Sequence, residues 1–353
     1  MKILTIPDKM RAIIKEKPEK GAIALVEKDV PKDLGPHDVL IRVYAVSICG
    51  SDLHIYLWNE WAQEHVRPPQ TIGHEFSGEV VAVGKEVSMV QIGDFVSSET
   101  HIPCGKCKQC RTGNMHVCQH LQILGVDRDG AFADYIKVPE IVLWKNDPSI
   151  PHVWASVQEP LGNAVHTIFT EDVTGKNVLV TGAGPIGLLA IEVLRVAGVA
   201  KLIVSEINEY RRNLAKEIGA DIVVDPLKED LVDVVKRETD GDGADVLIEM
   251  SGNEKALNDG LAALTAAGRA SLLGVYNSDV KLNLNDLVIF KALRIYGITG
   301  RKMFDTWYKV GDLLKNRKLD LSKVITHTFD FEDYEKGFRL MEEGKCGKIV
   351  LKL

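Results

Sequence analysis

The chain has 353 residues, of which 45% are hydrophobic and 26% charged, so it is long enough for two domains that each bury a core. Its net charge of −7 makes nucleic acid and anionic lipid surfaces poor candidate partners. No run of about 18 apolar residues and no secretory leader is visible in the sequence. These features predict a globular, cytoplasmic protein with a small-molecule ligand.

The first part of the chain has the pattern of a β-rich domain with many turns. Closely spaced charges in residues 1–30 indicate an extension that leads into short strands. Residues 39–46 are mostly apolar and rich in β-branched side chains, which predicts a strand that ends next to Cys49. Residues 78–83 and 94–97 predict further strands, separated by glycines.

Cys49, His74 and Glu75 form the first candidate site. A thiolate, an imidazole and a carboxylate are ligands that hold a catalytic zinc ion while leaving one position open. Ser51 and His54 follow Cys49 closely and carry groups that can move a proton. Taken alone, a cysteine or histidine beside an apolar strand is more often a packed core residue, and this alternative stays open at this point.

Four more cysteines form the second candidate site. Cys104, Cys107, Cys110 and Cys118 are separated by short glycine-containing and basic segments. Four thiolates at such spacings can close around one tetrahedral zinc ion and stabilise a loop that has little core of its own. The alternatives are a redox or disulfide role and a DNA-reading finger, which the negative charge and the missing histidine pair disfavour. Cys346 stands apart, and no role is predicted for it.

From residue 176 onward, apolar strands alternate with amphipathic helices, and the helices end at glycines. The sequence predicts strands at 177–181, 202–205, 222–224, 245–250, 270–274 and 293–297, and helices at 186–197 and 209–218. Strands that alternate with helices of this length imply right-handed crossovers and a doubly wound parallel sheet.

Gly182, Gly184 and Gly187 lie at the first strand-to-helix turn and match the G-x-G-x-x-G pattern. The first glycine permits a tight turn, the second lets the backbone approach a pyrophosphate, and the third allows close helix packing. Glu206, at the end of the next strand, is the residue type that binds the adenosine ribose hydroxyls. A glycine turn that serves packing alone is the alternative, and the strand, turn and helix context argues against it.

The choice between NAD and NADP rests on the same carboxylate. The negative charge of Glu206 would repel a 2′-phosphate. Arg211 and Arg212 could argue for NADP, but they lie a turn further along the chain. We therefore predict NAD.

In this order, the run from Cys49 to His54, the Gly73-His74-Glu75 triplet, the four cysteines and the glycine fingerprint resemble the zinc-dependent medium-chain alcohol dehydrogenase family over essentially the whole chain. The resemblance implies an α/β protein with a GroES-like distorted β-barrel catalytic domain at residues 1–160 and 303–353. It implies a Rossmann nucleotide domain with a doubly wound parallel sheet at residues 161–302. The substrate is then expected between the two domains.

The same resemblance implies roles for individual residues. Cys49, His74 and Glu75 would hold the catalytic zinc ion, and Glu159 would be a transient fourth ligand or part of the proton path. The cofactor contacts it implies, besides the three fingerprint glycines, are Ile186, Glu206, Arg211, Leu273, Gly274, Val275, Ile298 and Thr299.

Ser51 and His54 match the family's proton relay, although many members have threonine in place of Ser51. His101 resembles a residue that lines the substrate side, and an ordinary structural histidine is an equal alternative.

Residues 54–61, 158–166 and 297–304, together with Trp307, are similar to the members of the family that oxidise L-threonine. This similarity implies oxidation of the β-hydroxyl of L-threonine to 2-amino-3-oxobutanoate with reduction of NAD, in a homotetramer. One alternative is a zinc-dependent polyol, butanediol or sugar dehydrogenase, because a few side chains decide a pocket's preference. Another is a nucleotide-binding regulatory protein without chemistry, although that role would not need an open metal site.

Overall fold

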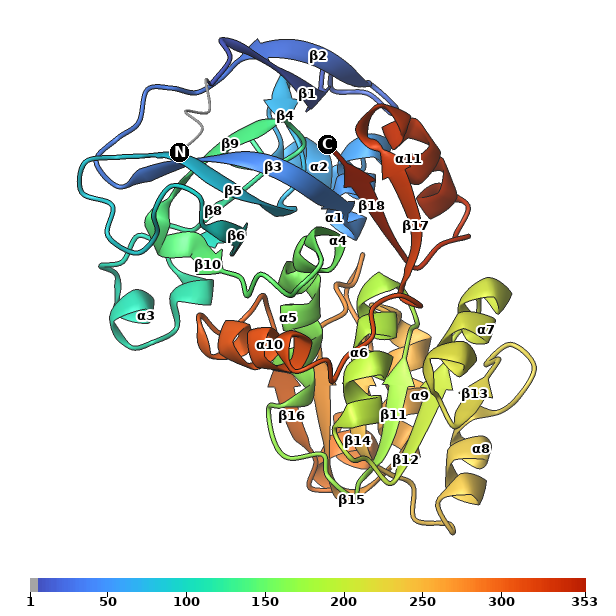
Figure 1. Ribbon diagram of the computed structural model, residues 1–353. Coiled ribbons are helices and arrows are strands. Elements are labelled where there is room, and N and C mark those ends of the chain that lie inside the picture. Colours follow the sequence, from blue (N-terminus) through green and yellow to red (C-terminus); the bar gives the residue numbers. More distant parts are fainter. Residues whose placement is uncertain (1–5) are drawn as a thin grey trace.

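The structure is a computed structural model that describes residues 6–353, so residues 1–5 of the predicted N-terminal extension lie outside the described part. Figure 1 shows a β-rich body at the top and an α/β body below it. In the described part of the chain, no helix is both long enough and apolar enough to cross a membrane.

The β-rich body confirms the strands predicted at 39–46, 78–83 and 94–97. Its strands are β1 (Lys9–Lys15), β2 (Ile23–Asp29), β3 (Asp38–Ile48), β4 (Gln70–Thr71), β5 (Glu75–Val83), β6 (Phe95–Ser98), β7 (His101–Ile102), β8 (Gln122–Ile123), β9 (Tyr135–Pro139), β10 (Leu143–Lys145), β17 (Ile325–Asp330) and β18 (Lys348–Lys352). β3 is central, because it pairs with β5, β9 and β18.

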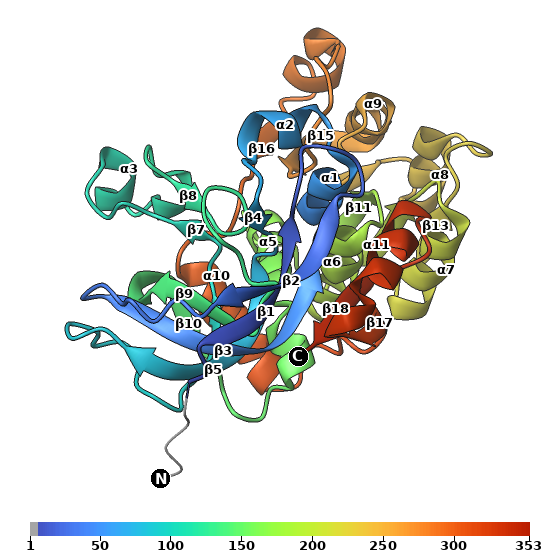
Figure 2. The same cartoon turned by 90° about the horizontal axis from the view of Figure 1, so that it is seen from above.

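The end of the chain returns to this body. β18 runs antiparallel to β3, with Ile349 opposite Ile48 and Leu351 opposite Val46. In Figure 1 the red arrows of β17 and β18 lie beside the blue β3, and Figure 2 shows the same arrangement from above. Both strands have apolar side chains that are buried on each face, which ties the last residues to the centre of the sheet.

Short helices connect these strands. They are α1 (Gly50–Leu57), α2 (Glu60–His65), α3 (Lys108–Arg111), α4 (His152–Ala155), α10 (Asp305–Lys315) and α11 (Tyr334–Glu342), with 3₁₀ turns η1 (Met115–Val117), η2 (Glu140–Val142) and η4 (Phe331–Asp333). α1 begins directly after β3, so the residue between them, Cys49, is held at both ends.

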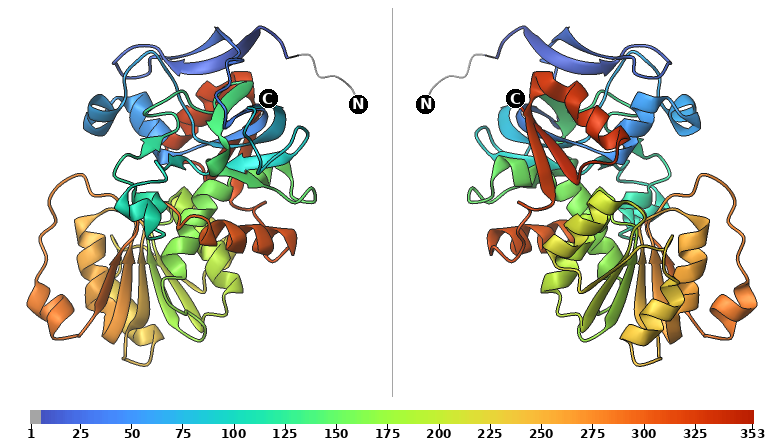
Figure 3. Two further views of the ribbon diagram at one scale, coloured as in Figure 1. Left: turned by 90° about the vertical axis from the view of Figure 1, so that its left-hand side faces the viewer. Right: turned by 90° about the vertical axis from the view of Figure 1, so that its right-hand side faces the viewer.

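The α/β body contains one parallel sheet in the order β13-β12-β11-β14-β15-β16. Its elements are β11 (Asn177–Thr181), α6 (Pro185–Val196), β12 (Lys201–Ser205), α7 (Glu209–Ile218), β13 (Ile222–Val224), α8 (Leu231–Glu238), β14 (Ala244–Glu249), α9 (Glu254–Ala263), β15 (Leu264–Leu272), η3 (Asn285–Ile289) and β16 (Arg294–Gly297). The strand order reverses between β11 and β14, and Figure 3 shows helices on both faces of the sheet, as predicted for a doubly wound fold.

One strand differs from its prediction. β15 begins at Leu264 rather than at residue 270, and it ends at Leu272. The amides of Leu273 and Gly274 both donate to the backbone oxygen of Glu249, which turns the chain away from the sheet after Leu272.

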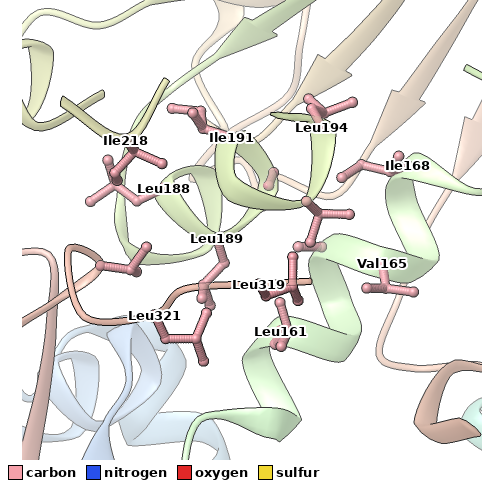
Figure 4. Packing of buried hydrophobic residues seen from close by; sticks show 14 of the residues in the cluster. Leu161, Val165, Ile168, Leu188, Leu189, Ile191, Leu194, Ile218, Leu319 and Leu321 are labelled. Atoms are coloured by element: carbon pink, nitrogen blue, oxygen red, sulfur yellow. The ribbon is translucent and has the colours of Figure 1, made fainter. Parts of the chain in front are cut away.

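A shared core joins the two bodies. Every residue from Gly187 to Leu194 of α6 is buried. α5 (Gln158–Ile168) packs against α6, and Figure 4 shows Leu319 and Leu321 of the C-terminal segment between these helices. Burying one such leucine stabilises a fold by about 1.5–3 kcal/mol. The same cluster includes Ala45 of β3 and Val350 of β18, so the core extends from the parallel sheet of the α/β body to the central strands of the β-rich body.

Candidate metal centres and dinucleotide site

The first candidate metal centre lies where β3 ends and β5 begins. Ser47 of β3 is opposite Glu75 of β5, and its hydroxyl donates to the Glu75 carboxylate. This pairing brings Cys49 beside His74. The ligand atoms of Cys49, His74 and Glu75 all lie within 4.8 Å of one another. This donor set fits a zinc ion with three protein ligands and one open position.

Two charged residues that the sequence analysis did not assign surround these donors. Asp52 accepts the Cys49 amide at 2.9 Å and places its other oxygen 3.7 Å from Nδ1 of His74. Nζ of Lys348 lies 2.8 Å from Oε1 and 2.6 Å from Oε2 of Glu75. A carboxylate behind a metal-binding histidine orients the ring, so Asp52 could have been found from its place beside Cys49. Lys348 is 273 positions away from Glu75, so no local sequence pattern could have linked the two residues.

Glu159 lies in the first turn of α5 and is 4% exposed. Its Oε1 is 2.5 Å from an Nη atom of Arg301, whose guanidinium also forms a two-point pair with Glu99. Burial raises the pKa of Glu159 to about 6, although the charge of Arg301 lowers it. Glu159 is not part of the group of donors within 4.8 Å, and its charge interacts with those of His74 and Glu75. It therefore stands next to the donor set as a group that can hold a proton near neutral pH.

The two relay candidates lie three residues apart on α1. Oγ of Ser51 is 3.5 Å from Nε2 of His74, so Ser51 adjoins the donor set. His54 is exposed, and its Nδ1 accepts a hydrogen bond from the Asn59 amide at 2.9 Å. Within the described residues, no hydrogen bond joins Ser51 to His54. The structure thus places one end of the relay at the donors and the other in solvent.

The second candidate metal centre is formed by the cysteines around α3. The ligand atoms of Cys104, Cys107, Cys110 and Cys118 lie within 4.8 Å of one another, and all four thiols are free. Sγ of Cys107 is 3.5 Å from that of Cys110 and 3.7 Å from that of Cys118. Four sulfurs at about 2.3 Å from one zinc ion would be about 3.8 Å apart. The segment from Cys104 to Cys118, which we call the cysteine lobe, therefore fits a closed zinc site; its helix α3 stands at the outer edge of the molecule in Figure 2.

The glycine fingerprint occupies the turn between β11 and α6. Gly182 has a φ of +88°, and a Cβ there would lie 2.9 Å from the backbone of Ser251, so only glycine fits. A Cβ on Gly184, the N-cap of α6, would meet no atom within 4 Å, which leaves open space in front of the helix N-terminus. Gly187 packs against the Gly182 carbonyl, and a Cβ there would lie 2.1 Å from that oxygen. The turn fits a pyrophosphate at the positive end of α6.

Glu206 follows β12 and lies beside this turn. Its carboxylate accepts the amide of Ala183 at 2.6 Å and the amide of Asn208 at 2.8 Å. Arg212 donates to the backbone oxygen of Glu206 and pairs with Asp225 at 3.0 Å. Because the guanidinium of Arg212 is engaged in this way, it does not neutralise the site at which a 2′-phosphate would lie.

Comparison with known proteins adds an independent finding. The family described as the alcohol dehydrogenase GroES-like domain matches residues 35–148, and the family described as zinc-binding dehydrogenase matches residues 185–316. The chain is 55% identical to L-threonine 3-dehydrogenase from Pyrococcus furiosus over 98% of this chain and 99% of the relative. It is 48% identical to L-threonine 3-dehydrogenase from Bacillus subtilis, over 97% of this chain and 98% of the relative.

The chain belongs to the zinc-binding alcohol dehydrogenase family. Solved structures agree: an alcohol dehydrogenase from Thermus sp. ATN1 has a TM-score of 0.88 at 30% identity, with 97% of this chain and 99% of that chain covered. 2R,3R-butanediol dehydrogenase from Bacillus subtilis has a TM-score of 0.86 at 30% identity, with coverage of 98% and 99%. The predicted α/β architecture is confirmed, and the predicted cofactors, zinc and NAD, are those of this family.

In this zinc-binding dehydrogenase, the remaining predicted cofactor residues lie at the same edge of the parallel sheet as the fingerprint. Leu273, Gly274 and Val275 follow β15, and Val275 is 86% exposed. Ile298 and Thr299 follow β16, and the Ile298 amide donates to Leu272. Ligands of doubly wound sheets bind at this carboxyl edge. Ile186 is half-buried in the first turn of α6, and Arg211 lies in the first turn of α7.

The chain leads directly from this edge to the first metal centre. Two residues after Thr299 comes Arg301, which contacts Glu159. The ring of His101 packs against Gly300, and its amide donates to Glu99. The structure therefore brings His101, a sequence candidate, together with Arg301 and Glu99, which the sequence analysis missed.

Proposed function

We propose that this dehydrogenase oxidises the β-hydroxyl of L-threonine to 2-amino-3-oxobutanoate and reduces NAD to NADH. The observation that carries the proposal is the 55% identity to a curated L-threonine 3-dehydrogenase over nearly the whole of both chains. The donor set of Cys49, His74 and Glu75 supports it, because secondary-alcohol oxidation requires an acidified hydroxyl.

The side chains then have distinct roles. Cys49, His74 and Glu75 hold the catalytic zinc ion, which when bound supplies a Lewis acid that lowers the pKa of the substrate hydroxyl. Ser51 would accept the substrate hydroxyl proton at Oγ while it gives up its own proton, since this atom adjoins His74. His54 is exposed and releases the proton to solvent. Glu159, with its pKa of about 6, is a second group that can hold a proton beside the donors.

The dinucleotide is held by the carboxyl edge of the parallel sheet. Gly182, Gly184 and Gly187 shape the turn that receives the pyrophosphate, and Glu206 binds the adenosine ribose. Further contacts come from Ile186, Arg211, Leu273, Gly274, Val275, Ile298 and Thr299. The four cysteines of the lobe hold the second zinc ion.

We also propose the domain limits of residues 1–160 with 303–353 for the catalytic domain, and residues 161–302 for the nucleotide domain. The pairing of β18 with β3 supports the return of the C-terminal segment to the catalytic domain. The exact position of the second boundary stays a prediction, since Val310 and Leu314 of α10 pack in one core with α5.

The protein is further proposed to be a cytoplasmic homotetramer. β16 is an edge strand of the parallel sheet, and η3 projects from that side in Figures 2 and 3. Leu284, Ile289, Phe290 and Ile295 are exposed on and near these elements, which supports contact with a second copy. Light scattering should give the mass of a tetramer, and a monomeric mass would contradict this part of the proposal.

A single assay tests the activity. NADH formation should be most efficient, by kcat/KM, with L-threonine when it is compared with 2,3-butanediol, sorbitol and glucose. Chelation of zinc should abolish the signal, and readdition of zinc should restore it. Higher efficiency with any of the three other alcohols would overturn the proposed substrate.

A 2,3-butanediol dehydrogenase is the second candidate. The structural similarity to the Bacillus subtilis butanediol dehydrogenase favours it, but at 30% identity this relative is more distant than the threonine dehydrogenases. The same assay separates the two.

A further inference from the structure

An α-amino acid substrate carries a carboxylate that a simple alcohol does not, and a buried carboxylate needs hydrogen-bond donors. Arg301 is the nearest guanidinium to Glu159, but it is already engaged. Its Nε and one Nη pair with Glu99, and its other Nη lies 2.5 Å from Glu159 and 3.2 Å from Asn163. These contacts use most of the N–H donors of Arg301, so a buried substrate carboxylate needs further donors.

His116 and His166 supply such groups. His116 lies in η1 of the cysteine lobe, and His166 lies on α5, on the helix face that also carries Glu159 and Asn163. The two rings meet edge to face, with 5.5 Å between their centroids. The lobe thus reaches across to the helix that adjoins the first metal centre.

The hydrogen bonds of this pair are unequal. Nδ1 of His166 donates to the carbonyl oxygen of Gly300 at 2.9 Å, which fixes the tautomer and orientation of the ring. Nδ1 of His116 is buried and has no hydrogen-bond partner among the described residues. A buried polar atom without a partner is costly, and a bound ligand would supply the missing partner.

The surrounding charges favour an anion. Both carboxylate oxygens of Glu99 are engaged by Arg301. Lys302, which follows Arg301 in the chain, is exposed. Glu99 is therefore paired, and Lys302 adds an exposed positive charge to this region.

We propose that His116 donates a hydrogen bond to the α-carboxylate of the amino-alcohol substrate, with Lys302 contributing its charge and His166 holding the His116 ring in place. This inference rests on the proposed oxidation of L-threonine. It assigns the cysteine lobe a second task, because the zinc site would then position a residue that recognises substrate.

The test compares two ligands that differ in the carboxylate. KM for L-threonine is measured together with the competitive inhibition constant of 1-amino-2-propanol, which has the hydroxyl and the ammonium but no carboxylate. His116→Leu should raise KM for L-threonine about tenfold or more, as expected for loss of a hydrogen bond to a charged group, and leave the inhibition constant within about twofold. His116→Asn keeps a donor and should restore part of the affinity. Lys302→Met should raise KM for L-threonine by a smaller factor than His116→Leu does, and it should leave the inhibition constant of 1-amino-2-propanol unchanged.

His120→Leu is the matched control, since His120 is an exposed histidine two residues after the cysteine lobe. It should change neither constant, and all variants should retain two zinc ions per subunit. An unchanged KM in His116→Leu, or equal weakening of both ligands, would overturn the subsite alone. If the wild-type enzyme does not oxidise L-threonine at all, the proposed function fails, and the subsite fails with it.

Discussion

Lys348, in the last strand of the chain, forms a buried ion pair with both carboxylate oxygens of Glu75, a donor of the first metal centre. Both side chains are at most 1% exposed, and the Lys348 ammonium also donates to the carbonyl oxygen of Ile48. The C-terminal strand therefore takes part directly in holding a metal donor in place.

Replacement of Lys348 should destabilise the protein. Lys348→Met leaves the Glu75 carboxylate buried without its partner, and removal of one member of a buried pair costs about 3–5 kcal/mol. We expect a clear fall in Tm, measured by calorimetry. Lys345→Met is the control, because Lys345 is 65% exposed and its pair with Glu343 should contribute less than about 1 kcal/mol. Equal Tm values for the two variants would show that the pair does not stabilise the fold.

The two metal centres should be separable by single substitutions. Cys49→Ser should lose one of two zinc ions and nearly all turnover, while NAD binding measured by fluorescence titration stays close to that of the wild type. Cys110→Ser should also lose one zinc ion, but it should lower Tm, because the cysteine lobe has little core of its own. Full turnover in Cys49→Ser would refute a role of this residue in the chemistry.

Cofactor preference should depend on Glu206. Glu206→Ala removes the carboxylate beside the fingerprint turn, so KM for NAD should rise by about tenfold and the ratio of NADP to NAD efficiency should increase. Steady-state kinetics with both cofactors measure this ratio. Glu209→Ala, at an exposed position in the first turn of α7, should leave the ratio unchanged. The same ratio in both variants would mean that Glu206 does not contact the ribose.

Stability should depend on pH through Lys15. This lysine is buried, and desolvation lowers its pKa to about 8 from the usual 10.5. The pKa of Lys15 is lower in the folded state than in the unfolded state, so the folded protein binds this proton less readily. The contribution of Lys15 to the free energy of unfolding is therefore most favourable above about pH 10.5, and it is lost as the pH falls through 8.

The free energy of unfolding of the wild type, relative to that of Lys15→Met, should therefore rise by about 1–2 kcal/mol between pH 7.5 and 10.5, after allowance for solvent screening. Denaturant titrations at several pH values measure the difference. Lys17→Met, at an exposed position, should show no such trend. A flat difference for Lys15→Met would mean that its ammonium is not penalised by burial.

Much of the fold could be predicted from the sequence because its signals are local. A parallel strand buried on both faces appears as an apolar run, as at Asn177–Thr181, and a helix that covers it ends at a glycine, as α7 does at Gly219. The residue types of the two zinc sites and of the glycine fingerprint were readable for the same reason. Each lies at the end of a recognisable strand or within one short loop.

The tertiary structure alone decided which distant residues meet. Lys348 reaches Glu75, Arg301 joins Glu99 to Glu159, and His116 meets His166 only because separate segments pack together. Local patterns encode burial and backbone preference, but they carry no record of which charged or polar groups become neighbours. Those partners depend on the packing of the whole chain, in which the free energy of one contact is small compared with the sum.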